Sequence, residues 1–90
     1  MKYYNEIDIA DRGLVPTYPF SAGRSVVYAN HLIAKHRYLT NRNAVIEVWD
    51  VYTDITGKGF IERTFKTLKA AKAYIYKSYM EKVIINPIKK

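Results

Sequence analysis

The chain has no cysteine and few acidic residues, eight in ninety. The lack of cysteine excludes both a disulfide framework and a thiolate metal site, and it fits a reducing compartment. No apolar run approaches membrane-spanning length, and residues 1–6 lack the apolar core of a signal peptide. We therefore expect a soluble protein of the cytoplasm.

Positive charge is abundant and unevenly placed. The net charge is +7, and the last 25 residues hold seven lysines against Glu81 alone. Such a basic end favours an anionic partner, either nucleic acid or an acidic protein surface. The alternative is a set of lysines that are merely solvated on a helix face. Nine of the thirteen aromatic residues are tyrosines, which suit half-buried rims and interfaces.

The stretch from Ala44 to Lys82 has the pattern of a β-hairpin followed by a helix. Residues 44–52 are rich in β-branched and aromatic side chains, residues 54–59 contain two glycines for a tight reversal, and residues 60–65 form a second strand. Thr67 is the expected N-cap of a helix from Leu68 to about Lys82. Both faces of residues 44–52 are apolar, which predicts a central strand, or one covered on its second face by the preceding arm or a partner.

The first half of the chain is less regular. Residues 3–9 alternate like a half-buried edge strand, and the pattern breaks at residues 11–13. Pro16 and Pro19 make residues 14–20 an extended arm, which we expect to pack on the core; the alternative is a mobile arm that orders on a partner. Ser21 or Ser25 would then cap a helix to about Leu39, with its apolar side formed by Val26, Ala29, Leu32, Ile33 and Leu39.

These elements predict a single α+β domain with a small antiparallel sheet of about three strands and two helices. In order, residues 1–20 form a strand and an extended arm, and residues 21–43 form a helix and a polar turn. Residues 44–82 form the hairpin and its helix, and residues 83–90 form a basic tail. Within that tail, residues 83–88 are apolar enough to add a short strand.

No combination of residues predicts catalysis. On the expected helix, His31 and His36 lie about 140° apart and cannot chelate one ion together. His36 instead falls in the apolar sector, as expected for a core-margin histidine with a hydrogen-bond partner. Glu47 and Asp50 point to opposite faces of a regular strand. The segment 57–59 lacks the glycine-rich lead-in of a phosphate loop. We expect no enzyme activity, metal or cofactor.

Basic and aromatic residues alternate near the end of the expected first helix and recur on the hairpin and the last helix. Lysine and arginine neutralise phosphates and release counterions, and tyrosine can stack on unpaired bases. The candidate residues for binding nucleic acid or another partner are Lys35, Arg37, Tyr38, Arg42, Lys58, Arg63, Lys66 and Lys69.

One part of the chain resembles a known family. Trp49-Asp50-Val51-Tyr52, then Gly57-Lys58, then residues 64–74 (TFKTLKAAKAY) are similar to the hairpin–helix signature of AP2-like domains and of the arm-type DNA-binding domains of phage integrases. The resemblance implies a three-stranded sheet in the DNA major groove, buttressed from behind by the helix. It implies a hairpin turn at Gly57-Lys58, strand-borne basic residues at Lys58 and Arg63, and a sheet–helix contact between Phe65 and Ala71.

The resemblance covers about a third of the chain, and it has two departures. The second strand carries Glu62 and few basic residues, and residues 1–43 have no counterpart in the family.

Two functions fit these observations. The first is a non-enzymatic DNA- or RNA-binding protein with a basic face. The second is a small inhibitor encoded by a phage or mobile element, which would bind a host protein or nucleoprotein complex in the host cytoplasm. In the second case, an exposed aromatic such as Tyr38 or Tyr76 should matter more than single lysines, because aromatic anchors dominate protein interfaces.

Overall fold

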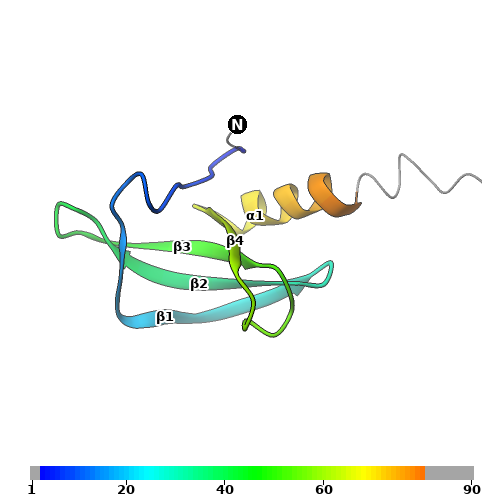
Figure 1. Ribbon diagram of the computed structural model, residues 1–90, viewed down its shortest axis with the longest axis horizontal. Coiled ribbons are helices and arrows are strands. Elements are labelled where there is room, and N and C mark those ends of the chain that lie inside the picture. The colour runs from blue at the N-terminus through cyan, green and yellow to red at the C-terminus, as the bar shows by residue number, and fades with distance from the viewer. Residues whose placement is uncertain (1–2, 81–90) are drawn as a thin grey trace, which may run out of the picture.

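The computed structural model describes residues 3–80, which form a four-stranded antiparallel sheet with an α-helix on one face (Figure 1). The elements are β1 (Val15–Tyr28), β2 (His31–Leu39), β3 (Val45–Tyr52), β4 (Ile61–Phe65), α1 (Leu68–Ile75) and a π-helical turn, η1 (Tyr76–Met80). The strands pair in sequence order, β1-β2-β3-β4. The α+β prediction agrees with this architecture, but the details differ: the described residues hold four strands and one α-helix.

The predicted hairpin and capped helix are confirmed. β3 pairs with β4, and the loop between them turns at Gly57 with φ of 77°. The Thr67 hydroxyl accepts a hydrogen bond from the backbone N–H of Ala70 at 3.1 Å, which satisfies a free donor of the first helical turn. Helix α1 passes into η1 after Ile75. The end of the expected helix at Lys82 and the candidate strand at residues 83–88 lie outside the described residues.

The helix predicted over residues 21–39 is wrong, because this segment forms the β1–β2 hairpin. Ala29 and Asn30 connect the strands with φ of 50° and 65°, the left-handed pair that a two-residue hairpin loop needs. The spacing of apolar residues such as Val26 and Ile33 fits a helix, but these two residues are paired across neighbouring strands.

The N-terminal strand predicted over residues 3–9 is also wrong. Asn5 has φ of 59°, and Glu6 bonds back to Tyr3 through both its backbone N–H and its carboxylate, so the chain turns here. A single bridge between Glu6 and Phe65 attaches this segment to the outer edge of β4. The segment lies at a sheet edge, as expected, but as a turn rather than as a strand.

The predicted packed arm is correct for half of its apolar side chains. Leu14 is buried and Phe20 packs on the core, whereas Val15 and Tyr18 are exposed. Residues from Val15 onward belong to β1 rather than to a separate arm.

The sheet separates two apolar clusters. On the helix face, which we define as the side covered by α1, side chains of the inner strands pack against the helix: Ile33, Trp49, Val51, Phe65, Ala70, Ala71, Tyr74 and Ile75. On the opposite side, the arm face, Tyr38 and Val48 pack against Ile7 and Leu14 from the N-terminal segment. β3 contributes to both clusters, so the prediction that both of its faces are covered is confirmed.

Candidate functional site

Two of the predicted basic residues lie side by side on the helix face. Lys35 and Arg37 alternate along β2, and both reach Glu47 on β3. The Lys35 Nζ is 3.2 Å from Glu47 Oε1, and the Arg37 Nε donates to Glu47 Oε2 at 3.0 Å. Hydrogen bonds from Lys35 and Arg37 lower the pKa of the Glu47 carboxyl. One carboxylate is thus shared by two cations, which leaves this part of the face positive.

Aromatic rings hold further cations beside this pair. The Arg24 guanidinium lies 5.5 Å from the centre of the Trp49 ring, and the Lys35 ammonium lies 5.6 Å from the same ring. On α1, the Lys72 ammonium lies 5.7 Å from the Tyr28 ring of β1. Cations near aromatic rings are attracted by the ring quadrupole, and the ring has no net negative charge that would neutralise them. Arg24 forms no ion pair with any residue between 3 and 80.

We call these residues the cation strip: Arg24, Lys35, Arg37, Lys69 and Lys72. Lys69 is exposed and precedes Lys72 by three positions on α1, so both leave the same side of the helix. The strip crosses β1, β2 and α1, and Glu47 is the carboxylate paired with it. Arg24 and Lys72 were not among the predicted residues. The contact between Arg24 and Trp49 could not be predicted from the sequence, because the pattern of residues 21–39 predicts a helix where the structure has β1 and β2.

The remaining predicted residues are dispersed. Tyr38 is 3% exposed and faces the arm side, so it cannot present an aromatic surface to a partner. Arg42 lies in the β2–β3 turn, whereas Lys58 lies in the β3–β4 loop at the other end of β3. Lys66 is exposed just before α1. The predicted position of Lys35, Arg37 and Arg42 at a helix end is wrong, because they belong to β2 and its turn.

Arg63 is committed to an internal contact. Its Nη1 donates to Glu6 Oε2 at 2.7 Å, and its guanidinium lies 5.2 Å from the Tyr3 ring and 5.6 Å from the Tyr74 ring. The hydrogen bond with Glu6 raises the pKa of Arg63. Arg63 therefore fastens the N-terminal segment to β4 and α1.

A buried carboxylate organises the arm face. Asp50 is fully buried, and its Oδ2 accepts hydrogen bonds from His36 Nδ1 at 2.7 Å and from the Tyr38 hydroxyl at 2.8 Å. The Thr64 hydroxyl donates to Oδ1. Burial, followed by the Asp50 charge, raises the pKa of Tyr38. The prediction that His36 is a core histidine with a hydrogen-bond partner is confirmed.

A second acidic group lies under the end of the helical segment. One extra residue in β4, opposite Val51 and Tyr52, forms a bulge at Glu62. The hydroxyls of Tyr74 and Tyr79 both donate to Glu62 Oε2, and Oε1 lies 3.8 Å from His31 Nε2. Burial and the contact with Glu62 raise the pKa of Tyr74. This cluster was not predicted, because a bulge changes the face of a side chain without any sequence signal.

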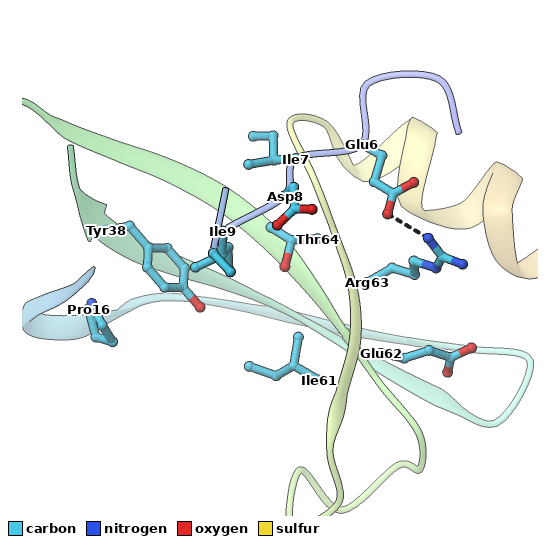
Figure 2. Close-up of a pocket in the computed structure, with 11 residues that line it drawn as sticks. Glu6, Ile7, Asp8, Ile9, Pro16, Tyr38, Ile61, Glu62, Arg63 and Thr64 are labelled. Atoms are coloured by element: carbon cyan, nitrogen blue, oxygen red, sulfur yellow. Dashed lines mark hydrogen bonds and ion pairs between the residues drawn. The ribbon is translucent and has the colours of Figure 1, made fainter. Parts of the chain in front are cut away.

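A cavity of about 510 Å³ opens between the N-terminal segment and β4 (Figure 2). Its walls include Ile7, Ile9 and Ile61, and Figure 2 shows Glu6 and Arg63 bonded to each other at its rim. Because these two charged groups already satisfy each other, they offer a ligand no free anchor. Among residues 3–80, no cluster of three or more histidine, cysteine, aspartate or glutamate side chains could hold a metal, and no helix is long and apolar enough to cross a membrane.

Comparisons with known protein families, with curated proteins and with solved structures gave no match.

Proposed function

We propose that this chain is a non-enzymatic nucleic-acid-binding protein that contacts phosphates through the cation strip. The observation that carries the proposal is that Arg24 and Lys35, from neighbouring strands, share the Trp49 ring. These cations are held in place by an aromatic ring, and Arg24 has no acidic partner among the described residues. Fixed cations of this kind neutralise phosphates and displace counterions without reading sequence.

The helix face suits this role better than the arm face. The resemblance to AP2-like domains would place the sheet surface opposite the helix in the DNA groove. In this chain, that surface holds the buried Asp50 network and is covered in part by Ile7 and Leu14. A buried carboxylate beneath apolar side chains offers nothing to a phosphate. We therefore assign the interface to the cation strip, with Lys66 as an exposed neighbour before α1.

A salt-dependent titration tests the proposal. Labelled duplex DNA, single-stranded DNA and RNA should bind near physiological salt, with a log–log salt slope of about −0.9 per phosphate contacted on a duplex. Arg24→Gln should reduce that slope by about one unit and weaken binding to all sequences similarly.

Lys58→Gln is the matched control, because it removes the same charge from an exposed site in the β3–β4 loop, away from the strip. It should change the slope far less than Arg24→Gln. Absence of binding to every nucleic acid at micromolar protein would reject the proposal.

A protein partner is the second candidate function, as for an inhibitor of a host complex. Exposed apolar side chains near the β3–β4 loop favour it: Phe60 is 82% exposed and Ile55 is 52% exposed. Tyr76, on η1, is also exposed, whereas Tyr38 is not. A pull-down from nuclease-treated lysate tests this function: a discrete protein retained by the wild type and lost with Phe60→Ala would support it.

A further inference from the structure

The β1 strand carries a bulge that presents one tyrosine to solvent. Pro16 of β1 pairs with Tyr38 of β2, and the next paired residues are Ser21 and His36. Between these two pairs, β1 advances by five residues whereas β2 advances by two. The extra residues loop out of the ladder and include Tyr18. The Tyr18 side chain is 96% exposed, so its ring makes almost no packing contact with the fold.

The residues around Tyr18 are held firmly. Arg37 Nη1 donates to the carbonyl oxygen of Ser21 at 2.9 Å and to that of Pro19 at 3.5 Å. The Phe20 ring stacks on His36 with 4.0 Å between ring centres. The bulge is therefore fixed on one side by a member of the cation strip and on the other by the arm-face cluster. Tyr18 is therefore an exposed residue directly before Pro19, whose backbone the Arg37 guanidinium contacts.

This part of β1 cannot recruit a further strand. Pro16 and Pro19 lack backbone donors, and the bulge interrupts the regular spacing of the edge. Such features prevent edge-to-edge pairing. What the segment offers a partner is a side chain, namely the exposed Tyr18 ring, on a stretch of backbone that Arg37 of the strip contacts at Pro19 and Ser21.

We propose that Tyr18 stacks on an unpaired base, so that single-stranded nucleic acid is the preferred ligand of the cation strip. The inference rests on the proposed function. A phosphate backbone lying on the strip would bring a neighbouring base to Tyr18. A base in a single strand has a free face for stacking, whereas a base inside a duplex is already stacked on both sides. Loss of one base–aromatic stack weakens single-strand binding by about 5- to 150-fold.

The test compares single-stranded and duplex DNA of equal length, titrated into the wild type and three variants. Tyr18→Ala should weaken single-strand binding by about 5-fold or more and leave duplex binding nearly unchanged. Tyr18→Phe keeps the ring and should bind like the wild type. Tyr4→Ala removes another exposed tyrosine, 81% exposed and outside β1, and should have no effect.

The outcomes separate this inference from the proposed function. If both nucleic acids bind in a salt-dependent way and Tyr18→Ala alters neither, or weakens both equally, the stacking inference is wrong and the phosphate-binding proposal stands. If neither nucleic acid binds the wild type, both are wrong. A circular dichroism spectrum and melting temperature matching the wild type confirm that the Tyr18→Ala protein is folded.

Discussion

His36 Nδ1 donates a hydrogen bond to Asp50 Oδ2 over 2.7 Å, inside the arm face of the sheet. The two residues come from neighbouring strands, β2 and β3, and Asp50 is completely buried. Tyr38 and Thr64 donate to the same carboxylate, so one acidic side chain satisfies three polar groups from two flanking strands. A buried carboxylate is costly without donors, and here the donors are supplied by the fold itself.

Removing this carboxylate should destabilise the protein strongly. Asp50→Ala leaves His36, Tyr38 and Thr64 without their acceptor, and we expect a loss of about 3–5 kcal/mol in the free energy of unfolding. Urea denaturation followed by circular dichroism measures it. Glu47→Ala, an exposed acid on the same strand, is the control and should change stability by at most about 1 kcal/mol. Equal losses for both variants would contradict a central role for Asp50.

The helix-face core should be sensitive to cavities. Ile75 is fully buried in the same cluster as Trp49, as predicted. Ile75→Ala should therefore cost about 2–5 kcal/mol, because the removed side chain leaves a cavity. Trp49 is 5% exposed, so its emission in the folded wild type should be blue-shifted relative to that in urea. A water-like emission maximum in the folded protein would show that the Trp49 environment is wrongly assigned.

The N-cap of α1, Thr67, should contribute measurably to the stability of the protein. Thr67→Ala removes the oxygen that accepts from the Ala70 N–H and should cost about 1 kcal/mol of stability. Thr67→Ser retains the oxygen and should recover most of that loss. The pair of variants is compared by thermal melting. If serine and alanine were equally destabilising, the hydroxyl would not be acting as a cap.

Alkaline pH should destabilise the fold through two buried tyrosines. Burial raises the pKa of Tyr38 and of Tyr74 above the ordinary value of 10.0, with further increases from Asp50 and Glu62. The stability that these two neutral tyrosines give to the folded state is fully present below pH 10, the pKa of tyrosine in the unfolded chain. Above it, the unfolded chain releases protons that the folded protein retains, so stability falls by up to about 1.4 kcal/mol per pH unit for each tyrosine.

Urea denaturation at pH values from 8 to 11.5 measures this decline. Tyr74→Phe removes one of the two groups and should make the slope above pH 10 shallower, even though it also lowers stability at pH 8. A slope identical to that of the wild type would mean that Tyr74 does not titrate as described.

The second half of the fold could be predicted because its signals are local. Thr67 marks a helix start, and the glycines at 57 and 59 mark a reversal between two β-rich runs.

β2 gives no such signal, because its buried side changes halfway along the strand. His31 and Ile33 are buried on the helix face, whereas His36 and Tyr38 are buried on the arm face. The alternation of buried and exposed residues that is typical of a strand is therefore interrupted between Ile33 and His36. In addition, the turn at Ala29-Asn30 contains no glycine that would indicate a hairpin.

The candidate site was only partly predictable for the same reason. Lys35 and Arg37 were identified from their charge alone, but their neighbours depend on strand register. Arg24 meets Trp49, and Arg37 reaches Ser21, only because β1 folds back on β2. Tyr38, two positions from His36, follows that residue into the arm-face core. Charge composition can predict that a basic surface exists, but only the pairing of β1 with β2 decides which cations share it.

The bridge between Glu6 and Phe65 has a consequence for the order in which the protein is made. The ribosome makes residues 3–14 before β4: Phe65 follows its partner Glu6 by 59 residues, and Thr64 follows its partner Ile7 by 57 residues. Until β4 is made, the segment that carries Ile7 and Leu14 has no β4 strand to bond to, and Asp50 lacks its hydrogen bond from Thr64. Residues 3–14 are therefore synthesised early, but they reach their native contacts only after β4 has been made.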